Sequence, residues 1–155
     1  MHVRNATKKD LDRLYDLLGT VQTLHADGRP DIFVAGTHKY TLDEISAIIE
    51  CPLSPVYVLV DSSDLACGYA FCQIIETGNQ NLHTIKNFYI DDLCVREDLR
   101  GNGYGKMLYD YALKKAKEYN CYHLTLNVWH LNESALKFYE KLGMKPLKTT
   151  METIL

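Results

Sequence analysis

Apolar residues recur every three or four positions in four stretches of the chain, which is the spacing of an amphipathic helix. Thr7 is followed three residues later by Asp10, and Thr41 by Glu44, so each pair resembles a capping box that begins a helix. The prolines at 52 and 55 end the second helix, because proline cannot continue one. The expected helices run from Thr7 to about His25, from Thr41 to the first of these prolines, from Tyr104 to Tyr119 and from Asn132 to Gly143.

Runs of apolar and β-branched residues between the helices indicate strands. Val56–Val60 and Ala66–Ile75 flank a polar turn and predict an antiparallel hairpin, while the polar residues Glu76–His83 are expected to form a flexible loop. An antiparallel first half followed by a β-α-β-α-β half predicts a mixed α/β sheet, mostly antiparallel, with helices on both faces. The expected strands cover residues 2–6, 56–60, 66–75, 86–95, 123–128 and 144–155.

Composition narrows the class of protein. With 155 residues, of which 46% are hydrophobic, the chain is expected to form one domain with a substantial core. A net charge of −3 argues against a nucleic-acid binder, which needs a basic surface. No apolar run is long enough for a membrane span, and the first ten residues are too polar for a signal peptide, so a cytoplasmic protein is expected.

The cysteines and histidines do not form a recognisable metal motif. The five cysteines are odd in number and include no C-x-x-C pair, and the six histidines are scattered. Reduced, mostly buried thiols are therefore expected, and no metal site.

The strongest local signal is the glycine-rich segment Arg100–Lys106, which lies between an expected strand and an expected helix. Glycines let a ligand approach the backbone, and the free N–H groups and dipole at the start of a helix favour an anion such as a pyrophosphate. Arg100 and Lys106 add positive charge. The glycines alone are equally compatible with an ordinary turn that caps a helix.

Spacing separates the families that use such segments. The dinucleotide fingerprint G-x-G-x-x-G, begun at Gly101, fails because its last glycine is replaced by Lys106. The P-loop fails because Met107 stands where that motif requires a hydroxyl residue. The pattern R-x-x-G-x-G fits at Arg100 and the two following glycines, at 103 and 105, and resembles the acyl-CoA pyrophosphate loop of the GNAT superfamily.

Three more segments resemble GNAT motifs and occur in the same order: Tyr89–Val95, Asn127–Ala135 and Ala135–Met144. The resemblance covers about residues 88–144. It implies a single N-acetyltransferase domain over residues 1–155 with a GNAT-like fold. It also implies acetyl-CoA as cosubstrate and direct transfer of the acetyl group to an amine in a ternary complex.

The resemblance assigns residues to the cosubstrate as well. The backbone of Leu93, Cys94 and Val95 is expected to bind the pantetheine arm and polarise the acetyl carbonyl, and Asn132 to contact CoA. N-capping of a helix explains Asn132 equally well. The expected cofactor-binding residues are Leu93, Cys94, Val95, Arg100, Gly101, Asn102, Gly103, Tyr104, Gly105, Lys106 and Asn132.

Tyr139 is the candidate general acid. It lies where members of the superfamily have the tyrosine that meets the CoA sulfur, and a phenol with a pKa near 10 can return a proton to a thiolate whose pKa is about 8.5. The alternative is a core aromatic, because Tyr139 is four residues after Ala135 and three before Leu142 on one helix.

Asp91 is the candidate general base, because a protonated alkyl amine cannot attack a thioester. Tyr89–Val95 resembles the Y-I-E-D-[LF]-[YF]-V run of diamine acetyltransferases, in which the acidic residue aligned with Asp91 contacts the amine. Asp92 and a chain of water molecules are the alternatives. A structural alternative is that neighbours on a regular strand face opposite sides, so that at least one of the two carboxylates meets only solvent.

Two further questions concern function and assembly. A non-catalytic acyl-CoA sensor of the same fold is the alternative function, and a sensor needs neither an acid nor a base. The sequence does not identify the acceptor, a small-molecule or peptide amine. His25, Arg29 and Asp31 are candidates to line its pocket, and Trp129 and His130 are either a binding surface or a plain strand exit. A homodimer is expected from the aromatic-rich C-terminal half and from the many GNAT relatives that dimerise.

Overall fold

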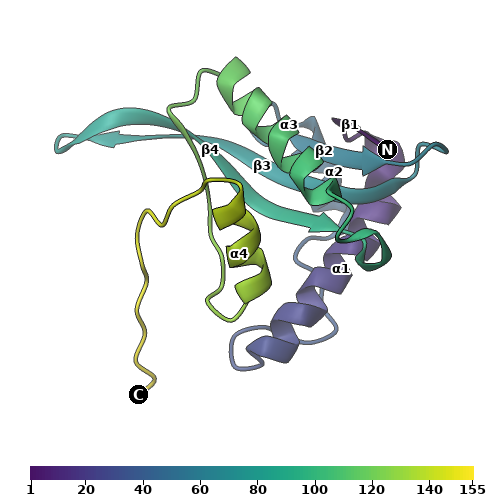
Figure 1. Ribbon diagram of the computed structural model, residues 1–155, viewed down its shortest axis with the longest axis horizontal. Coiled ribbons are helices and arrows are strands. Elements are labelled where there is room, and N and C mark those ends of the chain that lie inside the picture. Colours follow the sequence, from purple (N-terminus) through teal and green to yellow (C-terminus); the bar gives the residue numbers. More distant parts are fainter.

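The computed structural model describes residues 1–155 and is built around one five-stranded sheet (Figure 1). Neighbouring strands from β1 to β4 are antiparallel, and β5 is parallel to β4. This confirms the mixed, mostly antiparallel sheet. In spatial order the strands are β1 (His2–Asn5), β2 (Val56–Val60), β3 (Ala66–Asn79), β4 (Leu82–Val95) and β5 (His123–Leu126).

Four helices accompany the sheet, with two short 3-10 turns before α1 and α3. The expected capping box of α2 is present, since the Thr41 hydroxyl accepts the N–H of Glu44 and the Glu44 carboxylate accepts the N–H of Thr41. None of the helices combines the length and apolar character needed to span a bilayer. The elements are η1 (Lys8–Asp10), α1 (Leu11–Gly28), α2 (Leu42–Glu50), η2 (Glu97–Leu99), α3 (Tyr104–Glu118) and α4 (Glu133–Lys141).

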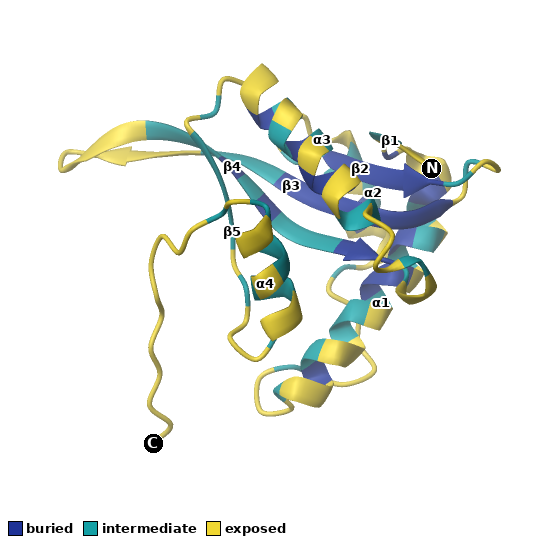
Figure 2. Cartoon of the chain, viewed as in Figure 1, coloured by how far each residue is buried: buried dark blue, intermediate teal, exposed yellow.

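Alternate residues of the central strands pack into two apolar clusters. Val58 belongs to a cluster with Leu14 of α1 and Ile45 of α2, whereas its neighbour Leu59 belongs to a cluster with Leu108 of α3. Because successive strand residues face opposite sides, α1 and α2 cover one face of the sheet and α3 covers the other. The buried strands between these layers are dark blue in Figure 2. The prediction of helices on both faces is therefore confirmed.

The hairpin of β3 and β4 is longer than the sequence predicts. Residues 76–83 do not form a loop, because the ladder continues through Glu76–Lys86 to Asn79–Leu82. Side chains in this part of β3 are exposed from Glu76 onward, so the strand pairing there depends on backbone hydrogen bonds and needs no apolar face. The hairpin consequently extends beyond the helices (Figure 1).

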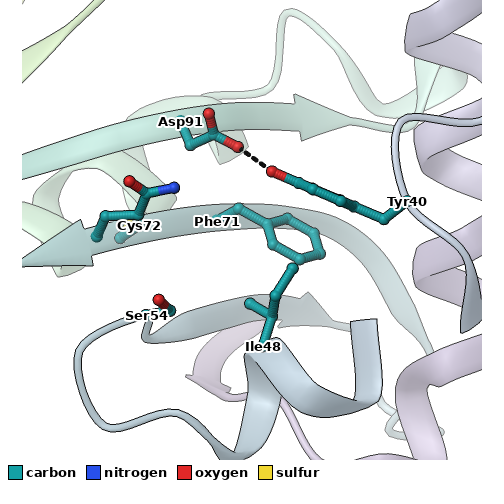
Figure 3. Close-up of a pocket in the computed structure, with 7 residues that line it drawn as sticks. Tyr40, Ile48, Ser54, Phe71, Cys72 and Asp91 are labelled. Carbon is teal, nitrogen blue, oxygen red and sulfur yellow. Dashed lines mark hydrogen bonds between the residues drawn. The ribbon is translucent and has the colours of Figure 1, made fainter. Parts of the chain in front are cut away.

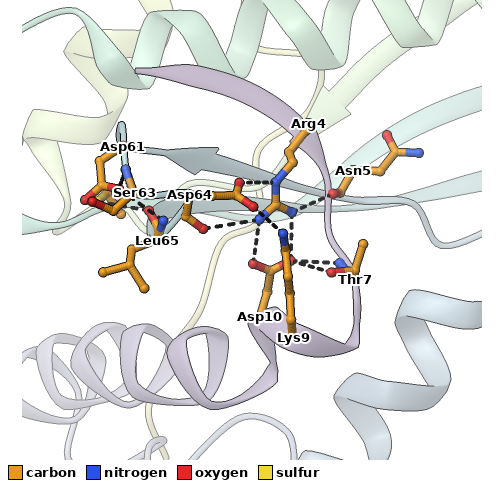
Figure 4. A network of polar contacts seen from close by, with 10 residues as sticks. Arg4, Asn5, Thr7, Lys9, Asp10, Asp61, Ser63, Asp64 and Leu65 are labelled. Atoms are coloured by element: carbon orange, nitrogen blue, oxygen red, sulfur yellow. Dashed lines mark hydrogen bonds and ion pairs between the residues drawn. The ribbon is translucent and has the colours of Figure 1, made fainter.

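A buried ion pair ties the first strand to the sheet and to the start of α1 (Figure 4). The Arg4 guanidinium donates to both oxygens of Asp10, at 2.8 and 2.9 Å, and its Nε donates to Asp64 at 2.7 Å. Burial would raise the pKa of Asp10, but hydrogen bonds from Arg4 and from the Thr7 N–H outweigh it, and the pKa is lowered. Asp10 is thus a buried, ionised anchor that is only 3% exposed.

The predicted last strand is wrong. α4 ends at Lys141, and the N–H of Met144, which donates to Tyr139 at 3.1 Å, makes the last backbone hydrogen bond of the chain. Residues 145–155 are all exposed and lead away from α4 without forming a helix or strand (Figures 1 and 2). The C-terminal half is therefore β-α-β-α, because the tail does not pair with the outer edge of β5 in its own chain.

Candidate active site

β4 and β5 separate partway along the sheet. The parallel ladder ends at the pair Ile90–Leu126, where β5 ends, while β4 continues through Leu93 and Cys94 to Val95. Over this last stretch, β3 is the only sheet neighbour of β4. Backbone groups on the other edge of β4 consequently face the space that β5 has left, and we call residues 91–95 the open edge.

The glycine-rich segment connects the open edge to α3. Gly101 and Gly103 have φ angles of 79° and 80°, where other residues are strained, and Gly103 is the N-cap of α3. None of the backbone N–H groups from Gly101 to Lys106 has an acceptor within the protein. A Cβ placed on either of the first two glycines would meet no atom within 4 Å. Residues 101–106, the donor row, therefore present free N–H groups with open space in front of them, an arrangement suited to an anion.

Polar side chains hold the segment in shape. Arg100 Nε donates to the carbonyl of Val95 at 3.0 Å, which places its positive charge at the end of the open edge. The Asn102 amide donates to the carbonyl of Arg100 at 3.2 Å and so closes the turn. Lys106 pairs with Asp110 at 2.5 Å, so only part of its charge is available to a ligand.

The start of α3 packs against α4 at Gly105. A Cβ on Gly105 would lie 3.3 Å from the ring of Phe138, so the glycine permits tight packing of the two helices. Tyr104 and Tyr139 pack in the same apolar cluster, and the Tyr139 ring lies 6.3 Å from that of Tyr109. These contacts fix α4 beside the donor row.

Tyr139 remains protonated at physiological pH. Burial raises the pKa of its phenol, and the negative charge of Asp92 raises it further. Its hydroxyl donates to no other residue. The buried side-chain N and O atoms without a hydrogen-bond partner are the hydroxyls of Tyr57 and Tyr69, so the unpaired Tyr139 hydroxyl is not fully buried. The Tyr139 hydroxyl is therefore a proton donor that retains access to a ligand.

An irregularity in β4 brings both aspartates to one face of the sheet. Cys72 pairs with Ile90, but the preceding residue Phe71 pairs with Asp92, so Asp91 is an extra residue in a β-bulge. Directly opposed residues share a face, and Phe71 belongs to the cluster beneath α1 and α2. Asp91 also faces that side, so the expectation that the two carboxylates point to opposite faces is wrong.

Asp91 closes a small pocket on this face (Figure 3). Its Oδ2 accepts hydrogen bonds from Lys39 Nζ at 2.7 Å and from the Tyr40 hydroxyl at 2.8 Å. Phe71 and Ile48 supply apolar walls. The pocket therefore combines apolar walls with a carboxylate whose Oδ2 is occupied by Lys39 and Tyr40.

Asp92 has a different environment from its neighbour. No ion pair reaches its carboxylate, and burial raises its pKa to about 6. The Tyr69 hydroxyl and the Leu93 N–H, both near the carboxylate, offset part of this rise. The positive charge of Lys39 opposes this shift, and the negative charge of Asp91 adds to it. Asp92 is therefore the carboxylate that changes charge close to neutral pH.

Two other predicted residues have structural roles. The Asn132 side chain accepts the N–H of Ala135 at 3.1 Å, which confirms the N-cap of α4 and leaves its amide N–H groups free. Burial raises the pKa of the Cys94 thiol to about 11, so the thiol stays protonated at neutral pH. Cys94 consequently offers its backbone rather than a nucleophile.

Sequence reasoning missed Lys39 and Tyr40, which reach the carboxylates from the loop before α2. No motif marks them, since 51 positions separate Tyr40 from Asp91. Among the residues proposed for the acceptor pocket, the His25 ring lies tilted against Phe33 at 4.9 Å, and Phe33 meets Trp129 edge to face at 5.2 Å. The side chains of Arg29 and Asp31 pair with each other at 2.8 Å, and His130 is exposed after β5.

Comparison with known proteins gives consistent results. Residues 20–144 match the model of the Acetyltransferase (GNAT) family. The chain is 31% identical over 113 residues to the peptidyl-lysine N-acetyltransferase YjaB of Salmonella typhimurium. This match covers 73% of the chain but 65% of the relative, so the chain spans just under two thirds of that relative's length.

Solved structures share the whole architecture. A variant of the BH1408 protein of Bacillus halodurans is 30% identical and superposes with a TM-score of 0.96, covering 100% of this chain and 99% of that one. The aminoglycoside N-acetyltransferase AAC(6')-Iy, in complex with a CoA bisubstrate analogue, is 14% identical with a TM-score of 0.75. That alignment covers 99% of this chain and 96% of the other and shows a common fold.

Proposed function

Since the chain belongs to the GNAT family of acetyltransferases, we propose that it transfers an acetyl group from acetyl-CoA to a primary amine. The observation that carries this proposal is the donor row, Gly101 to Lys106, directly beside the open edge of β4. Free N–H groups at the start of a helix match a pyrophosphate, and an unpaired strand edge matches an extended chain of amides. Acetyl-CoA contains both.

The proposed binding mode uses the backbone more than side chains. The pyrophosphate lies on the donor row with Arg100 beside it, and the pantetheine arm runs along Leu93, Cys94 and Val95 toward the carboxylates. Open space in front of Gly101 and Gly103 supports this fit, because a Cβ at either position would project into it. The free amide N–H groups of Asn132 are available to the same ligand.

The proposed chemistry is direct attack within a ternary complex. The neutral amine nitrogen bonds to the acetyl carbon, backbone N–H groups of the open edge stabilise the charge that develops on the carbonyl oxygen, and the carbon–sulfur bond breaks. Tyr139 supplies a proton to the departing thiolate: its free hydroxyl supports this role, and its raised pKa keeps the phenol protonated although it makes it a weaker acid. The proton lost by the amine goes to a carboxylate on the opposite face.

The two carboxylates take different parts in this proposal. Asp91, the base expected from the sequence, is already paired with Lys39 and Tyr40, so it is better suited to bind an ammonium that displaces Lys39. Asp92 has a pKa of about 6 and no ion-pair partner, so it is better suited to accept the proton, directly or through water. An acceptor with a cationic alkyl amine matches both groups.

The direct experiment is a thiol-release assay with purified protein, acetyl-CoA and a panel of small amines and lysine-containing peptides. We expect thiol release that depends on a primary amine. CoA binding by calorimetry without release for any amine would support the non-catalytic sensor instead, and no binding at all would reject both functions. The homodimer and the cytoplasmic location expected from the sequence stay predictions.

A further inference from the structure

The amino group of one lysine of the chain lies at the acceptor end of the candidate active site. Lys39 Nζ donates to Asp91 Oδ2 at 2.7 Å, and Asp91 is the first residue of the open edge. The other lysines that form ion pairs do so with carboxylates outside β4. Lys39 is therefore a primary amine held where the proposed function places the acceptor.

The segment around Lys39 is fixed on both sides. The ring of His38 stacks on Tyr15 of α1, with the two centroids 3.8 Å apart. Tyr40 packs against Phe71 of β3, at 5.8 Å between centroids, and donates its hydroxyl to the same aspartate as Lys39 (Figure 3). Lys39 thus lies between two anchored neighbours, which present its side chain to β4 before any ligand binds.

The Lys39 side chain retains the freedom to react. It is 36% exposed, and its flexible aliphatic stem lets Nζ leave Asp91 while the loop stays in place. Asp92 is close enough for the charge of Lys39 to lower its pKa. The amine therefore has next to it the carboxylate best suited to take its proton.

We propose that the protein acetylates its own Lys39 when acetyl-CoA is bound and no external amine is present. This inference rests on the proposed function, because it uses the same cosubstrate and the same groups. The Lys39 ammonium passes one proton to Asp92, the freed amine bonds to the acetyl carbon, and the carbon–sulfur bond breaks. CoA leaves as the thiol with a proton from Tyr139, which is replaced by the second proton that the nitrogen loses.

Self-acetylation and reaction with an external amine compete for one position. An ammonium that binds Asp91 displaces Lys39, so an external acceptor should protect Lys39, and initial rates with such an acceptor report the protein before Lys39 has reacted. An acetylated lysine carries no charge and cannot pair with a carboxylate. Each chain therefore reacts with itself once.

Full-length protein without added amine tests the proposal. The starting protein is mapped by mass spectrometry, and any acetyl group already on Lys39 is removed with a deacetylase. With acetyl-CoA, we expect release of one equivalent of thiol per chain and gain of one acetyl group, located at Lys39 by peptide mapping. The rate constant should not depend on protein concentration, because the amine and the site belong to one chain.

Matched variants separate the enzymatic step from chemical labelling of exposed lysines. Lys39→Arg keeps a cation beside Asp91 but removes the nucleophile, so the acetyl group should be lost. Lys114 is 73% exposed, and Lys114→Arg should leave labelling of Lys39 unchanged. Asp92→Asn should slow the labelling of Lys39 by about 10² to 10⁴.

Three results overturn self-acetylation: equal labelling of Lys39 and Lys114, labelling of Lys39 at an unchanged rate in Asp92→Asn, or a rate constant that rises with protein concentration. A parallel thiol-release assay with the amine panel separates this failure from failure of the proposed function. Release that requires an external amine, with Lys39 unlabelled when amine is absent, overturns self-acetylation and leaves the acetyltransferase proposal standing. Neither release nor labelling overturns both.

Discussion

The charge state of Asp92 gives a test of which carboxylate receives the proton. With a pKa of about 6, Asp92 is mostly ionised at pH 7 and mostly protonated at pH 5. The ionised fraction therefore falls about tenfold between these values, and the free-amine fraction of an alkyl amine with a pKa of about 10 falls about a hundredfold. On a logarithmic plot, kcat/KM should rise with a slope of one above pH 7 and approach a slope of two below pH 5.

Changing the neighbouring charge should move this break in a known direction. Lys39 lowers the pKa of Asp92, so Lys39→Met should shift the break to higher pH, and a shift of one unit corresponds to about 1.4 kcal/mol. Lys114→Met, on the exposed surface of α3, serves as the matched control and should leave it unchanged. Asp92→Asn should remove the break and reduce turnover by about 10² to 10⁴.

Carboxyl NMR titration of Asp92 would check the pKa without relying on activity. A break that persists in Asp92→Asn would refute the assignment and direct attention to Asp91 or to water. A break that moves to lower pH in Lys39→Met would contradict the electrostatic reasoning itself.

Three other changes test separate parts of the structure. Gly103→Val forces a branched residue into a left-handed φ of 80° and fills the space before the donor row, so calorimetry should show weaker CoA binding; unchanged affinity would disprove the binding mode. Tyr139→Phe keeps the ring, so turnover should fall by about 10² to 10⁴ with little change in CoA affinity or melting temperature; full turnover when chemistry limits the rate would make it a core aromatic. Arg4→Met leaves Asp10 buried without its cation, so the free energy of unfolding measured with denaturant at pH 7 should fall by about 3 kcal/mol. Lys8 and its partner are exposed, so the control Lys8→Met should change this free energy little. Because the pKa of Asp10 is lower in the folded protein, its ion pair stabilises the fold above the pKa that Asp10 has in the unfolded chain, and this stability is lost as the pH falls. The loss of stability caused by Arg4→Met should therefore shrink in acid, and a loss that stays constant would contradict this reasoning.

The sequence predicted those elements that depend on contacts between residues close together in the chain. The Thr41–Glu44 capping box and the Asn132 cap are contacts between residues three positions apart, and both form as expected. The glycine-rich turn likewise depends on backbone angles at Gly101 and Gly103 that few other residues adopt. Each of these signals is complete within a few residues of sequence.

Features that depend on residues far apart in the sequence were not predicted. Glu76–His83 is polar enough for a loop, yet it forms a ladder because the opposite strand lies beside it. Residues 144–155 were predicted as a strand, yet they lead away from the sheet and pair with none of its strands. Lys39 reaches Asp91 only because the loop before α2 folds back over β4, which no spacing in the sequence records.

The bulge at Asp91 also bears on how such a site changes in evolution. Residues on either side of it keep their faces: Ile90 packs against the α3 side, and Cys94 against the opposite side. Deleting the one codon for Asp91 would restore regular alternation and leave both clusters intact, with Asp92 alone facing the pocket. The number of acidic groups at this position can therefore change in single-codon steps without repacking the core.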